Sequence, residues 1–243
     1  SGNNYVGGLV GDNSYDASII NSYATGAISG NKYVGGLVGD NIYYATISNS
    51  FWDTQSSGQA ISAGGRGMIT ADMQTLPNFT SATTANGNVN PGWDFNNTWV
   101  MYDGYTYPLL RSFMAPLTVT ANSATKTYDG QAYLGGNGVT YSSIPNGNLF
   151  GTVSYGGSAQ GAVNANSYAI ALEGLYSNQQ GYIISYADGT LTIDPKALNV
   201  IGTTAQNKTY DGTTAATLSG GSLTGVIGSE DVTLGQSGSF DTK

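Results

Sequence analysis

The eleven residues "NNYVGGLVGDN" at positions 3–13 recur almost unchanged as "NKYVGGLVGDN" at positions 31–41. Self-similarity at a fixed period of about 20–50 residues is typical of proteins built from stacked units. The likeness continues past the phrase, because at the same 28-residue offset Ile19 meets Ile47. Each period holds two β-type runs that are too short to form a core alone, so the sequence predicts a parallel β-solenoid (β-helix) with one coil per period over residues 1–58.

Stacked coils would bring equivalent side chains together. Adjacent coils lie about 4.8 Å apart, which places Leu9 over Leu37, and the paired glycines would let each coil turn a sharp corner. Asp12 would lie over Asp40, and two carboxylates at that distance repel by only roughly 1 kcal/mol in water. A solvated turn is the favoured interpretation. A shared Ca²⁺ is the alternative, although the several acidic residues per turn of the usual calcium-binding solenoid motif are missing; no other metal or cofactor is expected.

Composition favours an all-β protein and argues against two classes of partner. Only 9% of the 243 residues are charged and 36 are glycine, while Thr, Val, Ile and the 18 tyrosines suit half-buried strands. The net charge of −8, with seven scattered Lys and Arg, argues against nucleic-acid binding and against docking to an anionic membrane. No apolar stretch reaches about 18 residues, so membrane insertion is not expected.

The residue types that carry most enzyme chemistry are missing. The chain has no cysteine and no histidine, which removes disulfides, thiolate metal sites and the commonest general base. Acidic residues do not form a recognisable pair for glycoside hydrolysis, and Arg66 and Arg111 are the only arginines available to neutralise an acidic sugar. No catalytic or cofactor-binding residue is predicted and the chain is expected not to be an enzyme; a polysaccharide-degrading β-helix enzyme is the remote alternative.

Residues 59–115 form a connecting region of different composition. "TADMQTL" at 70–76 predicts a short helix, with Thr70 capping its start and Pro77 ending it. Residues 92–110 concentrate aromatic side chains, which we expect to cap the open end of the solenoid. The alternative is an exposed platform on which glycans stack, made of Trp93, Trp99, Tyr102, Tyr105 and Tyr107.

A new pattern begins at residue 116. "KTYDG" at 126–130 returns 82 residues later at 208–212, and strand-like runs lie between the two copies. "ADGT" at 187–190 is a strong hairpin-turn signal. The pattern predicts one complete β-module over residues 116–194, either a β-grasp or an immunoglobulin-like sandwich, and part of a second over residues 195–243. The chain therefore reads as an internal piece of a longer protein.

These motifs resemble known modules. "YVGGLVGDN" resembles the GLUG repeat of large bacterial surface proteins, and residues 50–74 are similar to the segment that commonly follows the last such repeats. "KTYDG" resembles the YDG and MBG-type modules that occur in tandem after them. Together they resemble filamentous-haemagglutinin-like adhesins exported by two-partner secretion. Within that motif, Tyr128-Asp129-Gly130 is predicted to form a turn rather than to contact a ligand.

The resemblance implies a secreted virulence-associated fibre at the bacterial cell surface, which mediates or supports attachment to host cells or surfaces. Its implied partners are the rest of the same exoprotein, a host receptor or glycan, and the outer-membrane transporter of the secretion pair. The resemblance carries no active site onto any residue of this chain. A carbohydrate-binding segment is the alternative function.

Overall fold

The computed structural model describes residues 1–242, so Lys243, the last residue of the predicted second module, lies outside the described residues. The fold is all-β: the described chain contains twenty-two short strands, three four-residue α-helices and one 3-10 turn. It divides into two compact units. One comprises Ser1–Leu117, Ser143–Gly151 and Leu175–Ser185, and the other comprises Thr118–Ser142, Thr152–Gly174 and the described residues from Tyr186 onward.

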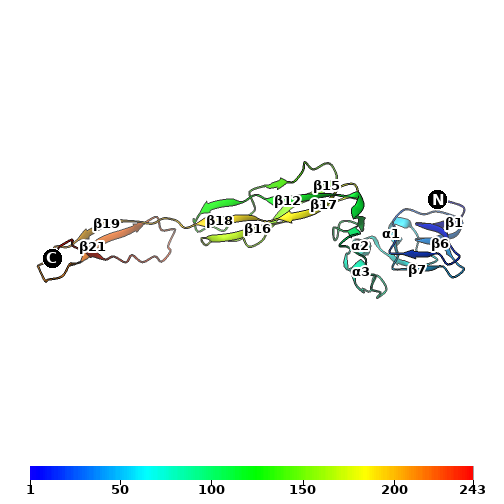
Figure 1. Cartoon of the computed structure of the whole chain (residues 1–243), viewed down its shortest axis with the longest axis horizontal. Coiled ribbons are helices and arrows are strands. Elements are labelled where there is room, and N and C mark those ends of the chain that lie inside the picture. The colour runs from blue at the N-terminus through cyan, green and yellow to red at the C-terminus, as the bar shows by residue number, and fades with distance from the viewer. Residues whose placement is uncertain (243) are drawn as a thin grey trace. The chain divides into compact units, whose positions relative to one another are not determined.

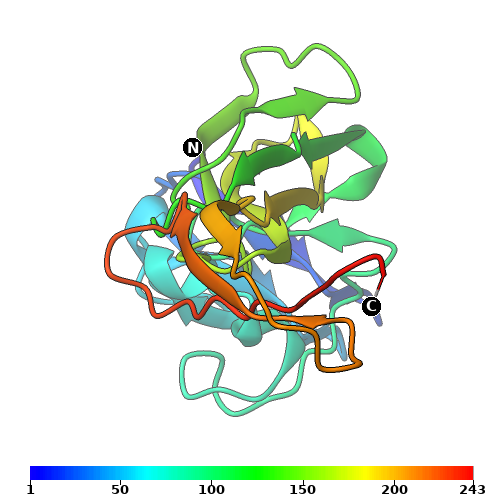
Figure 2. The ribbon, with the colours of Figure 1, turned by 90° about the vertical axis from the view of Figure 1, so that its left-hand side faces the viewer.

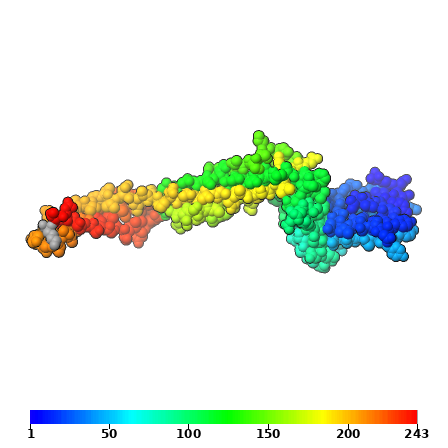
Figure 3. Space-filling model, viewed as in Figure 1, coloured from blue at the N-terminus to red at the C-terminus, as the bar shows by residue number. Residues whose placement is uncertain are grey.

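The repeat region consists of two 28-residue repeats of four strands each, which we call the first and the second coil. The first coil, residues 3–30, contains Asn4–Gly7 (β1), Val10–Asn13 (β2), Ser18–Ile20 (β3) and Tyr23–Ala24 (β4). The second coil, residues 31–58, contains Lys32–Gly35 (β5), Val38–Asn41 (β6), Thr46–Ser48 (β7) and Phe51–Asp53 (β8). Together the coils form one continuous block, drawn in blue and cyan (Figures 1 and 3).

Equivalent strands of the two coils pair in parallel at the 28-residue offset. The pairs are β1 with β5, β2 with β6, β3 with β7 and β4 with β8. The Leu9 amide donates to the Leu37 carbonyl at 2.9 Å, and the rings of Tyr5 and Tyr33 stack with centroids 4.7 Å apart. The predicted register of the two phrases, Leu9 beside Leu37, is confirmed.

The chain bends directly after the first glycine of each pair, at Gly8-Leu9 and at Gly36-Leu37. The predicted Gly7-Gly8 and Gly35-Gly36 pairs do not have positive φ; Tyr5 and Tyr33 do, at 55° and 50°. The glycines are needed for close approach instead. A Cβ on Gly36 would lie 2.0 Å from the Trp52 ring, far inside van der Waals contact. The glycine pairs therefore supply the bend as predicted, at positions where a Cβ would clash, while the positive φ falls on tyrosine, which rarely adopts it.

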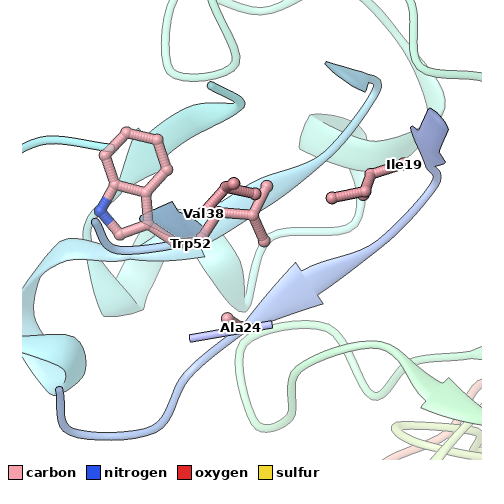
Figure 4. Close-up of a cluster of buried hydrophobic side chains, with 5 residues drawn as sticks. Ile19, Ala24, Val38 and Trp52 are labelled. Atoms are coloured by element: carbon pink, nitrogen blue, oxygen red, sulfur yellow. The ribbon is translucent and has the colours of Figure 1, made fainter. Parts of the chain in front are cut away.

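A small apolar core fills the coils. Ile19, Ala24, Leu37, Val38 and Trp52 are buried together. Figure 4 shows the Trp52 ring beside Val38, with Ile19 and Ala24 contributed by the first coil. The Trp52 indole Nε1 donates to the Gln59 carbonyl at 2.9 Å, which satisfies the only polar atom of the ring. Both coils thus contribute to one core, which neither could form alone.

A third layer covers the second coil. The strand Arg66–Met68 (β9) pairs in parallel with β8. Before it, the Gly36 amide donates to the Ile61 carbonyl, and the Ala63 amide donates to the Val38 carbonyl. We call residues 59–68 the covering strip. The second coil is therefore hydrogen-bonded on both sides, to the first coil and to the strip.

The chain has three one-turn helices: Thr54–Ser57 (α1) at the end of the second coil, and Thr70–Met73 (α2) and Pro77–Thr80 (α3) in the connecting region. The predicted helix over 70–76 is confirmed only in its first turn. Ile69 is the N-cap, and the Thr70 hydroxyl instead donates to Asp53. Pro77 begins α3 rather than ending a helix, a position at which the missing N–H of proline costs nothing.

The residues from 99 to 194 add nine strands and one 3-10 turn. They are Trp99–Val100 (β10), Leu109–Leu110 (β11), Arg111–Phe113 (the 3-10 turn), Ala115–Ala121 (β12), Ala124–Thr127 (β13), Val139–Tyr141 (β14), Leu149–Gly156 (β15), Asn166–Ser177 (β16), Tyr182–Ala187 (β17) and Gly189–Asp194 (β18). Within the described residues 116–194 there is no helix, so the helix of a β-grasp arrangement is not found there.

Two sheets make up this module. One has the order β14-β12-β17 and the other β13-β18-β16-β15; their green and yellow strands lie side by side in two views (Figures 1 and 2). The turn at 187–190 does not make a hairpin. It passes β17 of the first sheet into β18 of the second, which pairs in parallel with β13. The predicted hairpin is therefore wrong, because β17 and β18 pair with strands of different sheets.

The last described strands are Asn199–Ala205 (β19), Ala215–Ala216 (β20), Leu218–Thr224 (β21) and Gly238–Ser239 (β22). β19 pairs with β21 and β20 with β22, both antiparallel. These strands belong to the predicted second module, and their side chains are mostly exposed.

Candidate functional site

The aromatic residues of the connecting region gather against the end of the second coil. Phe51, Met68, Met73, Phe79 and Trp93 are buried together. The Trp93 ring lies 4.9 Å from that of Phe79 and 4.6 Å from that of Trp99, centroid to centroid. We call this group, with the partly buried rings around it, the aromatic junction. It covers Phe51 in the way that a cap covers the end of a stacked array.

The five residues predicted to stack on glycans do not form one exposed platform. The side chain of Trp93 is 3% exposed, and its indole Nε1 donates to the Asn49 carbonyl at 3.0 Å. Its ring faces are covered, so the glycan-stacking prediction for Trp93 is wrong. Trp99, Tyr102 and Tyr107 are half-buried, while Tyr105 is 57% exposed.

Two of the tyrosine hydroxyls are already engaged. Tyr102 donates to the Tyr182 carbonyl, and Tyr107 donates to the Asp53 carboxylate at 2.7 Å. The Tyr105 ring stacks on that of Tyr176 with centroids 4.5 Å apart. These contacts hold the rings in place within the junction and leave only Tyr105 with a large exposed surface.

Asp53 is the polar centre of the junction. Its carboxylate is fully buried and accepts four hydrogen bonds, from the Gln55 and Ser56 amides at 2.8 and 3.0 Å and from the Thr70 and Tyr107 hydroxyls at 2.7 Å. Desolvation acts to raise its pKa, but these hydrogen bonds outweigh it, so the pKa of Asp53 lies below its ordinary value. A buried charge of this kind is stable only when it is fully hydrogen-bonded.

The role of Asp53 was not predicted from sequence, although a signal was present. The carboxylate caps the N-terminus of α1, and Asp directly before a short polar run is a common helix-start signal. Its other two partners lie 17 and 54 residues away, so only the fold brings them together. Asp53 therefore has a structural role: it holds α1, Thr70 and Tyr107 together.

Tyr23 joins the first coil to the junction. Its hydroxyl donates to the Pro108 carbonyl at 2.6 Å, and its ring lies about 6 Å from those of Trp93, Trp99 and Tyr107. Desolvation, with a smaller repulsion from Tyr107, raises the pKa of Tyr23 to about 12. The phenol is therefore held in its neutral form.

A shallow cleft opens beside the junction. It is lined by Leu9, Asn21, Ser22, Tyr23, Trp99, Leu110 and Gln179. Asn21 Oδ1 is buried and, among the described residues, has no hydrogen-bond partner. The Gln179 amide is fixed by Leu110, whose N–H and carbonyl it contacts at 2.7 Å each. Apolar ring surface beside oriented amides is the usual make-up of a small-ligand site.

The candidate metal residues lie together but lack further ligands. Asp12 and Asp40 are register partners across β2 and β6, as expected from the repeat. Asp40 accepts from the Asn41 amide at 3.0 Å, and Asp12 is near the Ser14 hydroxyl at 3.5 Å. Among residues 1–242, no group of three or more His, Cys, Asp or Glu side chains could hold a metal ion. Calcium binding at this pair stays a prediction.

The two arginines, Arg66 and Arg111, are used locally. Arg111 donates from Nε to the Trp99 carbonyl and from Nη2 to the Phe95 carbonyl, at 2.8 and 3.1 Å. Arg66 donates to the Ala85 carbonyl. These contacts fix the loops of the junction. In addition, none of the helices in the described part of the chain has the length and apolar character needed to cross a membrane.

Comparison with known families agrees with the motifs. The GLUG motif matches residues 2–29, the MBG domain (YGX type) matches residues 117–192, and the YDG domain matches residues 194–243. No curated protein and no solved structure matches the chain. The chain carries GLUG, MBG and YDG domains in that order, a combination typical of bacterial surface adhesin-like proteins.

Proposed function

We propose that this chain is a structural segment of a secreted bacterial surface fibre, a filamentous-haemagglutinin-like adhesin, and that it supports attachment to host cells or other surfaces. The observation that carries the proposal is the parallel pairing of the two coils at one offset through all four strands. Such pairing is what a parallel β-solenoid requires. The match to domains found in extracellular surface proteins supports the same location.

The proposed mechanism is mechanical. Backbone hydrogen bonds join the two coils, and side-chain amides add to them: Asn31 Nδ2 donates to Asn3 Oδ1 and Asn13 Nδ2 donates to Asn41 Oδ1, each at 2.7 Å. The aromatic junction then closes the end of the second coil. A pulling force must break many such bonds together, which suits a load-bearing shaft. Export through the outer-membrane transporter of a two-partner system is part of the proposal.

Adhesion and load-bearing are separated by two measurements on the same chain. Beads coated with the chain are tested for retention on host cells and on inert surfaces, and single chains are pulled in a force spectrometer. Retention above an albumin coat supports attachment through this segment. Resistance to force without retention supports a spacer role within a longer fibre. A chain that neither adheres nor resists extension would overturn the proposal.

The cleft beside the junction supports a second candidate, carbohydrate binding. Trp99 and Tyr23 line it together with Asn21 and Gln179, and aromatic rings with amides recognise sugars well. On a glycan array, Trp99→Ala is expected to lose any binding that the wild-type chain shows, whereas Tyr15→Ala, an exposed tyrosine of the first coil, is expected to keep it. Circular dichroism must show that both variants are folded. Wild-type protein that binds no glycan would exclude this candidate.

A further inference from the structure

The two "KTYDG" segments build the same turn twice. Lys126 pairs with Asp129 at 2.7 Å, and Lys208 pairs with Asp211 at 2.8 Å. Each aspartate also accepts from the amide two residues on, at 2.9 Å, and each lysine ammonium reaches a backbone carbonyl five residues on. The ion pair and the turn are therefore properties of the motif itself, and the prediction that the motif forms a turn is confirmed.

The glycines of the two turns match as well. Gly130 has φ of 74° and Gly212 has φ of 77°, a left-handed conformation that side chains rarely adopt. Their surroundings differ. A Cβ on Gly130 would lie 2.9 Å from Ile227 Cγ2, whereas a Cβ on Gly212 would meet nothing within 4 Å. One turn has a neighbour packed on it, and the other is open.

The tyrosines show the same difference. Tyr128 is partly buried, and its hydroxyl donates to the Glu230 carboxylate. Tyr210, its equivalent, is 77% exposed. The first turn is thus covered by a segment of the module that follows it, more than 90 residues later in the chain.

The covering segment is residues 225–232, "GVIGSEDV", which we call the plug loop. The Glu230 amide donates to the Ile227 carbonyl at 3.2 Å, and this tight turn presents an apolar and an acidic side chain close together. A cleft lies where the loop meets the first module, and its lining includes Tyr128 of the first turn together with Ile227 and Glu230 of the loop.

We propose that the Tyr-Asp-Gly turn is a joint between modules: it receives the plug loop of the following module, with Ile227 packed on Gly130 and Glu230 bound to the Tyr128 hydroxyl. Glycine is required at position 130 both for the turn and for the close approach of Ile227. The Lys126–Asp129 pair holds the turn so that the tyrosine hydroxyl stays in place. The joint would limit bending between the two modules. This proposal does not depend on which surface the fibre attaches to.

The second turn provides matched controls within the same chain. Hydrogen–deuterium exchange of residues 225–232 is measured on the full chain and its variants. Tyr128→Phe removes only the hydroxyl, and we expect exchange in the plug loop to become about tenfold faster, the effect of losing a hydrogen bond to a charged group. Tyr210→Phe is expected to leave this exchange unchanged.

The glycine pair tests the packing contact independently. Gly130→Ala and Gly212→Ala bring the same backbone strain, but only the first drives a Cβ into Ile227. Faster plug-loop exchange in Gly130→Ala and not in Gly212→Ala supports the joint. The proposed joint would be overturned if the variants of the second turn speeded plug-loop exchange as much as those of the first turn. It would also be overturned if the plug loop of the wild-type chain exchanged at the rate of an unprotected segment.

Discussion

The two coils of the repeat region have nearly the same sequence and very different burial. Leu37 is fully buried, whereas its equivalent Leu9 is 45% exposed. The second coil has the first coil on one side and the covering strip on the other, where Gly36 and Ala63 make backbone bonds across the layer. The first coil, within the described residues, pairs on one side only. Burial is therefore set by how many neighbouring layers a coil has.

This difference has an energetic consequence. In a stacked array the stability of each repeat is approximately the sum of its own folding and of its interfaces with neighbours. The second coil has two such interfaces and the first has one. Substitutions at equivalent positions should therefore cost more in the second coil, and the 28-residue offset supplies the matched pairs.

The largest effect is expected at the leucine pair. Leu37→Ala removes a fully buried side chain, and such truncations cost about 2–5 kcal/mol of unfolding free energy. Leu9→Ala should cost about 1 kcal/mol or less, because the side chain is already half in water. Urea denaturation followed by tryptophan fluorescence measures both. Equal losses at the two positions would mean that the coils are equally covered in solution.

The next largest loss of stability is expected at Gly36. Its Cβ position lies 2.0 Å from the Trp52 ring, so Gly36→Ala must displace a buried indole, at about 1–3 kcal/mol. Gly26→Ala in the first coil meets nothing within 4 Å and serves as the control. A change in the Trp52 emission maximum should accompany the loss of stability. A Gly36→Ala variant as stable as the wild type would place Trp52 elsewhere.

The register of the coils could be read from the sequence, whereas the partners of single residues could not. The repeated phrase defines the 28-residue offset, so Val6 beside Val34 and Asp12 beside Asp40 follow directly. The "ADGT" signal is local, however, and it failed because β17 and β18 find partners in different sheets. Turn chemistry describes the bend but not the strands that it connects.

The aromatic junction likewise has features that the sequence predicted and features that only the fold determines. The aromatic content of residues 92–110 predicted a cap, and Trp93 does cover Phe51. Which rings are buried depends on the fold, and so does the assembly of the Asp53 network from partners up to 54 residues away. Positive φ at Tyr5 and Tyr33 also had no sequence signal, because tyrosine rarely adopts that conformation.

Asp53 should make the stability of the second coil, but not that of the first, depend on acidic pH. It belongs to the second coil, and the equivalent residue of the first is Thr25. Its pKa is lowered in the folded state by the hydrogen bonds that it accepts, so its stabilisation is present above the ordinary aspartate pKa of about 4 and is lost as pH falls through the lower folded value. Asp53→Asn should cost about 1–3 kcal/mol at neutral pH.

The pH profile separates this effect from simple loss of packing. The difference in unfolding free energy between wild type and Asp53→Asn should narrow as the pH is lowered below about 4. Asp16→Asn, an exposed position of the first coil, should leave the profile unchanged. If the difference in unfolding free energy stayed constant with pH, the charge of Asp53 would contribute nothing to stability.

Tyr23 and Phe51 give the smallest and most direct test, because they are register partners that differ by one hydroxyl. The pKa of Tyr23 is raised to about 12, so the folded chain keeps a proton that the unfolded chain releases near pH 10. Its stability therefore falls as pH rises from about 10 through 12, by about 2 kcal/mol for a shift of that size.

Tyr23→Phe makes the first coil match the second and should remove this alkaline loss. At neutral pH it should cost about 1 kcal/mol, since the Pro108 carbonyl loses its donor. Tyr15→Phe, on an exposed ring, is the control. An unchanged alkaline midpoint in Tyr23→Phe would mean that the Tyr23 hydroxyl is open to water and is not buried against the junction.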